Sequence, residues 1–276
     1  MSTAPTPASI DADLSFAIRA AHAAGQRLLS LREQNRWEDV TLGDVGDQAA
    51  DGYLNGFLEG RYPEDGVLSE ETKDSPERLS KSRCWIVDPL DGTKEYRGLR
   101  EDWGVHVALV LDGKPALGAV ALPSVGTTLW GVCLPGHERA GIEGSDATLV
   151  RGDSELPAGG PRIVVSRSHT PPWVESFAGE LGGQLDGWGS AGFKVGRCLL
   201  GQADCYVHKI GLKEWDTCAP EVVARSLGWH VCKLRGDEHA YNQPNPKNHE
   251  LVVCRPSMKD AVIEALAKSG ALEDER

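Results

Sequence analysis

The sequence predicts a mixed α/β fold built in layers, and three observations lead to this prediction. The chain of 276 residues is long enough to bury a substantial core, as one large or two smaller packed domains. Its 32 glycines and 16 prolines indicate many tight turns between short elements, which disfavours a helical bundle. In the second half, predicted strands alternate with predicted helices, which is typical of a layered α/β arrangement.

The first half is predicted to start with helices and to continue with strands. Apolar residues recur at helical spacing from Leu14 to Leu31, which predicts an amphipathic helix of about five turns. A second helix is predicted over 47–59. Short apolar runs bounded by turn residues then predict strands, two of which form a hairpin closed by an Asp-Gly turn. These strands are predicted at 66–68, 84–87, 103–111, 116–122 and 128–133.

A stretch rich in Gly, Asp, Glu and Ser between residues 135 and 161 predicts a domain junction. The chain is therefore divided into a flexible N-terminal tail (1–12), an α+β half (13–150) and an α/β half (151–276). Beyond the junction, strands are predicted at 162–165, 204–208, 230–234 and 250–254, and helices at 172–181, 191–200, 217–227 and 258–268.

Charge and cysteine content narrow the class of protein. The formal net charge is −12, which disfavours nucleic acid as a partner. The seven cysteines are odd in number and have no CxxC spacing, so reduced thiols and a cytoplasmic location are predicted. The N-terminus lacks the basic and apolar regions of an export signal. Prolines and glycines break the uncharged stretch 115–136 into strand-length pieces, so no membrane span is expected.

The densest chemical signal is the run WIVDPLDGT at residues 85–93. Asp88 and Asp91 follow a buried apolar run and enclose a proline, so a rigid turn is predicted to bring two carboxylates together. Mg²⁺ prefers such oxygen ligands and completes its shell with waters or phosphate. Gly92 lets a phosphate approach the backbone, and the Thr93 hydroxyl can hold a water. A lone DxxDG run is most often only a turn, so further acids are needed to support a metal site.

Further acids lie at the ends of other predicted elements. Glu70 and Glu71 follow a predicted strand, and Asp216 in the run EWDTCAP precedes a predicted helix. Asp44 and Asp47 lie near the start of the second predicted helix. Aspartate at a helix start is commonly an N-cap, which is the alternative explanation for Asp44, Asp47 and Asp216.

In their order and spacing, these motifs resemble the three signatures of the inositol monophosphatase superfamily of lithium-sensitive, Mg²⁺-dependent phosphatases. The spacing of 18 residues from Glu70 to Asp88 fits, and the similarity extends over nearly the whole chain. The runs VSRSH (165–169) and GSAGFK (189–194) are most similar to the 3'(2'),5'-bisphosphate nucleotidase, or CysQ-like, branch. The resemblance implies a layered αβαβα sandwich. It also implies hydrolysis of adenosine 3',5'-bisphosphate, a by-product of sulfate-donor metabolism, to AMP and phosphate.

The resemblance implies a role for each site residue. The implied ligands of two or three Mg²⁺ ions are Glu70, Asp88, Asp91, Asp216 and the Leu90 carbonyl. Bound cations would let an acidic protein accept an anionic substrate. The resemblance implies that Asp47 and Thr93 contact the attacking water. It also implies that the backbone of Gly92 and Thr93 contacts the phosphate, and that Ser190 and Lys194 contact the nucleotide. Asp44 competes with Asp47, which is favoured because it lies 23 residues before Glu70 in the family's helical pattern.

Other functions and partners stay open. An inositol or other sugar monophosphatase is the alternative enzyme, and a metal or nucleotide sensor is the alternative without catalysis. We expect a small phosphorylated substrate and a monomer or homodimer.

Several single residues carry expectations of their own. His106 and His208 are predicted to be strand residues without a metal, and Tyr241 is a candidate to face an adenine. Cys218 and Pro220 replace the small residues usual in the family. Pro220 is expected in the first helical turn, where it is tolerated, and Cys218 is expected to make the enzyme sensitive to oxidation.

Overall fold

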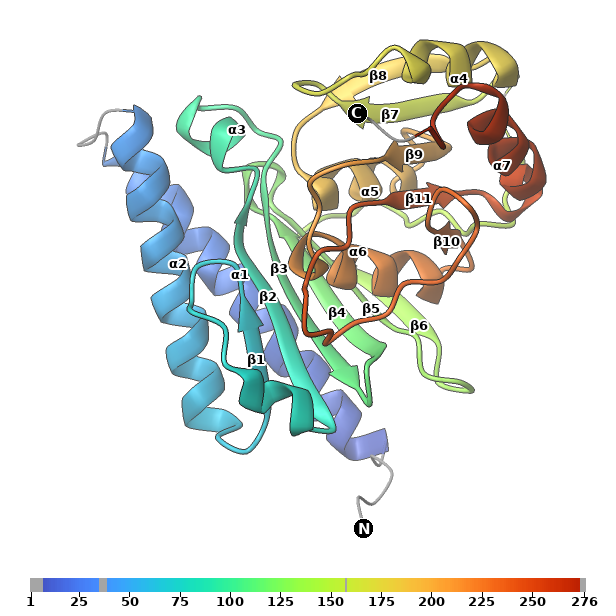
Figure 1. The fold of residues 1–276 in the computed structure, drawn as a ribbon. Helices are drawn as coiled ribbons and strands as arrows, with labels where there is room; N and C mark the ends of the chain where they lie inside the picture. The colour runs from blue at the N-terminus through green and yellow to red at the C-terminus, as the bar shows by residue number, and fades with distance from the viewer. Residues whose placement is uncertain (1–6, 35–38, 157, 274–276) are drawn as a thin grey trace.

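The computed structural model describes residues 7–34, 39–156 and 158–273, which form seven α-helices and two β-sheets stacked in five layers (Figure 1). The helices are α1 (Pro7–Glu33), α2 (Asp39–Arg61), α3 (Thr93–Arg97), α4 (Trp173–Leu181), α5 (Ala191–Leu199), α6 (Glu214–Ser226) and α7 (Lys259–Lys268). The strands are β1 (Gly66–Ser69), β2 (Arg83–Asp91), β3 (Gly104–Leu111), β4 (Lys114–Leu122), β5 (Thr127–Val132), β6 (Arg139–Glu143), β7 (Arg162–Ser166), β8 (Gln184–Trp188), β9 (Cys205–His208), β10 (His230–Cys232) and β11 (Leu251–Cys254).

The first sheet has the strand order β1-β2-β3-β4-β5-β6. β1 runs parallel to β2, and every other neighbouring pair is antiparallel. Helices α1 and α2 pack on one face, where Leu28 and Leu54 meet Trp85 in a shared core. Helix α6 packs on the other face against β4 and β5.

The second sheet has the order β10-β11-β9-β7-β8 and lies on the far side of α5 and α6. A second apolar core, which includes Val120 and Val223, joins both sheets to these two helices. A third core, which includes Phe177 and Leu266, lies between the second sheet and the outer helices α4 and α7. Because the second core fills both sides of the α5 and α6 layer, the three cores fill the four interfaces between five layers, and the predicted αβαβα sandwich is confirmed.

Three helices begin earlier than predicted. Helix α1 begins at Pro7, so residues 7–12 of the predicted flexible tail are helical, and residues 1–6 lie outside the described residues. Helix α2 begins at Asp39, so Asp44 and Asp47 are interior helical residues and the capping explanation is wrong for these two, whereas Asp216 accepts the N–H of the N-cap residue Lys213 in a capping box. Helix α6 begins at Glu214, which places Pro220 beyond the first turn where it was expected.

Three short elements were not predicted, namely β6, β8 and α3. Strands β6 and β8 are the last strands at an edge of their sheets, and none of their residues is buried. An exposed edge strand needs no alternation of apolar and polar residues, so its sequence resembles a loop. Because β6 lies inside the stretch predicted as a domain junction, the change between sheets comes after Glu143.

Candidate metal and phosphate site

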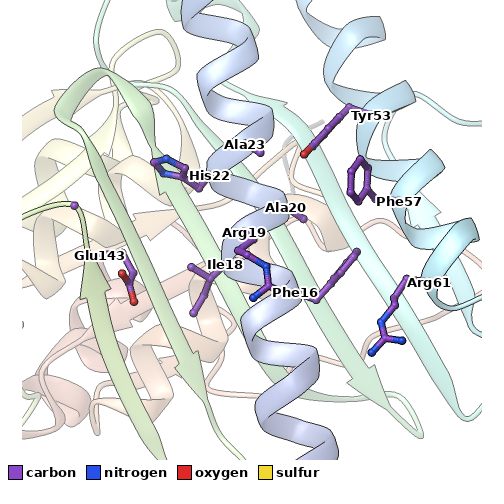
Figure 2. Close-up of a pocket in the computed structure, with 11 residues that line it drawn as sticks. Phe16, Ile18, Arg19, Ala20, His22, Ala23, Tyr53, Phe57, Arg61 and Glu143 are labelled. Atoms are coloured by element: carbon purple, nitrogen blue, oxygen red, sulfur yellow. The ribbon is translucent and has the colours of Figure 1, made fainter.

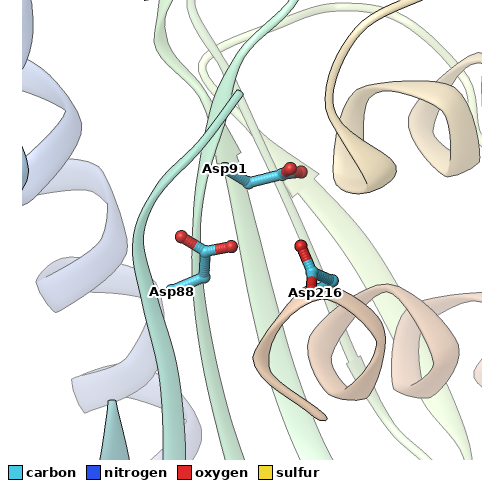
Figure 3. Close-up of side chains that lie close together, drawn as sticks. All are labelled: Asp88, Asp91 and Asp216. Atoms are coloured by element: carbon cyan, nitrogen blue, oxygen red, sulfur yellow. The ribbon is translucent and has the colours of Figure 1, made fainter. Parts of the chain in front are cut away.

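Three carboxylates converge where the first sheet meets α6. Asp88 and Asp91 come from the end of β2 and face Asp216 in the first turn of α6 (Figure 3). One oxygen from each of the three lies within 4.8 Å of the others. The register of β2 against β3 shifts between Asp88 and Asp91, and this irregularity replaces the turn that the sequence predicted after Asp88.

The carboxylate of Asp88 is placed so that one of its oxygens can bind a cation. Its Oδ1 accepts the Leu90 N–H at 3.0 Å, while its Oδ2 is buried and has no hydrogen-bond partner among the residues that the structure describes. Burial, reinforced by Glu70, Asp91 and Asp216, raises the pKa of Asp88 well above its usual range. An unpartnered buried carboxylate oxygen is costly unless a cation offsets it. The oxygen-only donor set therefore fits a hard metal ion such as Mg²⁺.

Asp91 is held firmly from the opposite side. Its Oδ1 accepts the Ala191 N–H at 3.1 Å, and its Oδ2 accepts the Gly192 N–H at 2.8 Å and the Ser190 hydroxyl. Burial alone would raise the pKa of Asp91, but His106, the Ser190 bond and Lys194 hold it below its usual range. Asp91 is thus an anion whose orientation is fixed by the start of α5.

The remaining predicted acids border this centre. Asp216 accepts the Lys213 N–H at 2.6 Å, and burial together with Asp91 raises its pKa to about 7. Glu70 directly follows β1, which pairs with β2 up to the residue before Asp88. The residue as a whole is exposed, but desolvation of its carboxyl group and the neighbouring Glu71 raise the pKa of Glu70 to about 7. Four carboxyl groups therefore share one region in which full ionisation is unfavourable without a cation.

Asp47 and Thr93 form a second feature at the edge of the acid cluster. The Thr93 hydroxyl has two acceptors, the Leu90 carbonyl at 3.2 Å and Asp47 Oδ1 at 3.4 Å. Gly46 lets α2 approach α3 closely, since an added Cβ would lie 2.8 Å from the Tyr96 ring. Asp47 is buried and Asp44 is exposed, so the structure favours Asp47 as the residue that contacts Thr93. Burial and Glu71 raise the pKa of Asp47 to about 7.

Gly92 separates the acid cluster from α3. Its φ of +92° lies in the left-handed region that favours glycine. An added Cβ would lie 3.2 Å from the Asp102 carbonyl and 3.3 Å from the Ser190 side chain. A side chain at this position would be strained and tightly packed, so glycine is favoured, and the predicted phosphate contact stays a prediction.

Ser190 and Lys194 have protein partners in this structure. The Ser190 hydroxyl donates to Asp91 and accepts the Phe193 N–H at 2.9 Å. Lys194 Nζ donates to the carbonyls of Ser190 at 2.6 Å, Gly189 at 3.0 Å and Trp188 at 3.4 Å. Desolvation lowers the pKa of Lys194 to about 8. Their predicted nucleotide contacts stay predictions, and these polar atoms would have to share or exchange their present partners to make them.

Two secondary expectations are wrong for reasons of burial. Tyr241 is fully buried and donates to Glu221 at 2.7 Å, so its ring does not face the site. Cys218 is also fully buried, and burial raises the pKa of its thiol well above the usual range. Oxidation proceeds through an exposed thiolate, so sensitivity at Cys218 is not expected.

The contribution of His106 was missed, although its description as a strand residue is correct. Its ring is fully buried on β3, 3.1 Å from Asp91 Oδ2 and 3.1 Å from the Trp215 carbonyl oxygen. Burial alone would lower the pKa of His106, but Asp91 and the Trp215 carbonyl raise it above its ordinary value. His208 lies on β9 and contacts the Ile210 carbonyl at 2.7 Å.

A groove of about 730 Å³ lies away from the acids, over α1 between α2 and β6 (Figure 2). Phe16, Tyr53 and Phe57 make it mainly apolar, while Arg19 and Arg61 border it. Glu143 is the one carboxylate among its lining residues. This groove has no group of converging acids and takes no part in the site described above.

The layered fold and the carboxylate cluster define an α/β protein with an acidic site able to bind a metal ion. The chain belongs to the inositol monophosphatase family, which it matches over residues 10–271. A relative from Mycobacterium leprae (strain TN), named 3'-phosphoadenosine 5'-phosphate phosphatase, is 36% identical over 272 residues and aligns with 94% of this chain and 92% of its own length. A protein of the same name from Mycobacterium tuberculosis is 36% identical over 253 residues, covering 88% of this chain and 89% of its own length.

Solved structures share the fold. CysQ from Bacteroides thetaiotaomicron, a bacterial member of the inositol monophosphatase family, has a TM-score of 0.75 and 27% identity over 88% of this chain and 97% of its own. Inositol monophosphatase II from Staphylococcus aureus has a TM-score of 0.78 at 21% identity, over 96% and 100% of the two chains. Of the helices that the structure describes, none has both the length and the apolar character needed to cross a bilayer.

Proposed function

We propose that this protein is a Mg²⁺-dependent phosphatase that removes the 3'-phosphate of adenosine 3',5'-bisphosphate to give AMP and phosphate. The observation that carries the reaction type is the convergence of Asp88, Asp91 and Asp216, with one buried Asp88 oxygen unpartnered. Support for the substrate comes from relatives named 3'-phosphoadenosine 5'-phosphate phosphatase at 36% identity over most of the chain.

Within this proposal, the acids bind the cations and orient the phosphate. The ligands are Asp88, Asp91, Asp216, Glu70 and the carbonyl of Leu90, which match the oxygen donors that Mg²⁺ prefers. Bound Mg²⁺ would offset the negative charge of the phosphate and make water a stronger nucleophile. The backbone N–H groups of Gly92 and Thr93 are the proposed contacts to phosphate oxygens.

Asp47 and Thr93 act on the attacking water. Thr93 can rotate its hydroxyl toward Asp47 or the Leu90 carbonyl, so its oxygen is available to accept a hydrogen bond from a water. Asp47 is the proposed acceptor of the proton that the water loses, because it is buried beside this hydroxyl. Water held in this way would attack phosphorus in line with the 3'-oxygen; a new P–O bond forms as the P–O3' bond breaks, and the 3'-oxygen leaves with the electron pair and takes a proton from solvent water to become the 3'-hydroxyl of AMP.

The test is phosphate release by the purified protein with Mg²⁺, comparing adenosine 3',5'-bisphosphate, AMP and inositol 1-phosphate at equal concentrations. We expect the bisphosphate to be preferred, and Li⁺ to inhibit the reaction. Faster turnover of inositol 1-phosphate would make the protein a sugar monophosphatase. Nucleotide binding without phosphate release from any substrate would instead favour the sensor function.

The raised carboxyl pKa values predict how metal affinity depends on pH. Glu70 and Asp216 have pKa values of about 7 without metal, so their protons compete with the cation below neutrality. Mg²⁺ affinity should therefore increase as the pH rises through about 7, with protons released on binding. Calorimetry in two buffers of different ionisation enthalpy measures this release, and an affinity independent of pH would contradict the prediction.

The same shifts predict the stability of the metal-free protein. A raised carboxyl pKa means that the folded state binds more protons than the unfolded state between about pH 4 and 7. The stabilisation that the protonated carboxyl group contributes to the folded state is therefore fully present below about pH 4 and is lost as the pH rises through about 7. In EDTA, Tm should fall across this range, and saturating Mg²⁺ should reduce the fall. Thermal unfolding at several pH values measures both trends.

We also propose a cytoplasmic location. All seven cysteines are free in the structure and six are buried, as is usual for proteins of a reducing compartment.

A further inference from the structure

Besides its predicted ligands, the acid cluster contacts one aromatic side chain from the neighbouring strand. In the register of β2 and β3, His106 is the direct partner of Asp88, so both side chains lie on the face of the sheet toward α5 and α6. The ring of His106 is fully buried. It therefore lies among the acids while belonging to neither of the elements that carry them.

The two ring nitrogens of His106 reach two different parts of the site. Nε2 lies 3.1 Å from Asp91 Oδ2, at the end of β2. Nδ1 lies 3.1 Å from the carbonyl oxygen of Trp215, the residue before Asp216 in the first turn of α6. One rigid ring thus contacts Asp91 and the backbone beside Asp216, two acids that are 125 residues apart in the sequence.

The start of α5 keeps this ring in place. A Cβ added to Gly192 would lie 2.1 Å from His106 Nε2, so only glycine permits the observed contact. The N–H of Gly192 donates to the same Asp91 oxygen at 2.8 Å. His106, Asp91 and α5 are therefore packed so tightly that the ring has little freedom to move away from the acid.

We propose that His106 is a positioning residue that sets the separation of Asp91 and Asp216 and so preorganises the metal site. This inference rests on the proposed metal-dependent function and adds a residue that acts through the ligands without binding the metal itself. Residues that orient ligands typically change metal affinity or activity about 10- to 100-fold when they are replaced. A role in packing alone would lower stability and leave the affinity of the folded protein for Mg²⁺ unchanged.

The experiment compares His106→Phe with the wild type by calorimetric titration of Mg²⁺ into the metal-free protein. Phenylalanine keeps a ring of similar size and lacks both nitrogens. We expect Kd to rise about 10- to 100-fold. The matched control is His230→Phe, because His230 is a strand histidine on β10 whose charged neighbours are Lys259, Arg225 and Asp260 and not the acids of the site. Its Kd should equal that of the wild type.

A second pair of variants covers the case in which His106→Phe does not fold. His106→Gln keeps one donor for Asp91 and should weaken Mg²⁺ binding less than Gly192→Ala, whose added Cβ would displace the ring. A wild-type Kd in folded His106→Phe, or in folded Gly192→Ala where His106→Phe does not fold, would overturn the inference. Absence of Mg²⁺ binding by the wild-type protein would instead overturn the proposed function, so the two failures are distinguishable. Kinetics should show the loss as a higher Mg²⁺ requirement, with the KM for the bisphosphate nearly unchanged.

Discussion

Asp88→Asn should abolish phosphate release while the protein stays folded. Asparagine can accept the Leu90 N–H as Asp88 Oδ1 does, so the backbone between Asp88 and Asp91 keeps its support. The unpartnered Oδ2, however, becomes an uncharged group that attracts a cation poorly. Removal of one site of charge stabilisation in the transition state costs about 10²- to 10³-fold, and the weakened binding of Mg²⁺ adds to this loss.

Stability without metal should change in the opposite direction. Burial and three neighbouring acids disfavour the ionised form of Asp88, so neutralising it relieves repulsion in the folded state. In EDTA at neutral pH, Tm of Asp88→Asn should equal or exceed that of the wild type, and the increase in Tm caused by Mg²⁺ should be lost. A loss of stability to obtain activity is common at catalytic sites.

The control for Asp88→Asn is Asp153→Asn. Asp153 is exposed and contacts Arg151 at 3.6 Å on the surface, so the same chemical change there should alter neither activity nor the response to Mg²⁺. Phosphate release by Asp88→Asn within about tenfold of the wild type would show that the acid cluster does not hold an essential metal.

The sequence predicted the parts of the site whose residues lie close together along the chain. Asp88, Leu90 and Asp91 form one run, and the proline between the acids predicts the irregular backbone that lies there. The sequence also indicates the end of β1, because an apolar run leads to Glu70. It indicates a helix near Asp216, because small residues follow this aspartate. Their convergence required the family resemblance, because spacing alone does not tell which element ends meet.

Contacts that depend on tertiary packing could not be predicted from the sequence. Ser190 and Lys194 were assigned to substrate on the glycine-rich run, but their present partners, Asp91 and three carbonyls, depend on how α5 meets β2. His106 gave no signal, because a lone histidine in an apolar strand has the same sequence pattern whether or not an acid lies beside it. Edge strand β6 was missed because burial, which creates the strand pattern, is incomplete there.

Asp47→Asn should lower kcat about 10²- to 10⁴-fold, the usual contribution of a general base, and leave KM and the Kd for Mg²⁺ nearly unchanged. The physical reason is that asparagine can still bond to the Thr93 hydroxyl but cannot take a proton from water. Asp44→Asn is the matched control, since Asp44 lies on the same helix and is exposed. Steady-state kinetics of both variants decide which aspartate acts, and a large loss in Asp44→Asn alone would reverse the assignment.

Thr93→Val should also lower kcat, because valine keeps the shape of threonine and removes the hydroxyl that donates to either Asp47 or the Leu90 carbonyl and that can hold the attacking water. If Asp47 and Thr93 hold one water together, they act as a unit and their losses are not additive. The double variant should then be only slightly less active than the less active of the two single variants. Losses that multiply in the double variant would mean that the two residues act independently. In that case Asp47 would need a partner other than Thr93 to orient the attacking water.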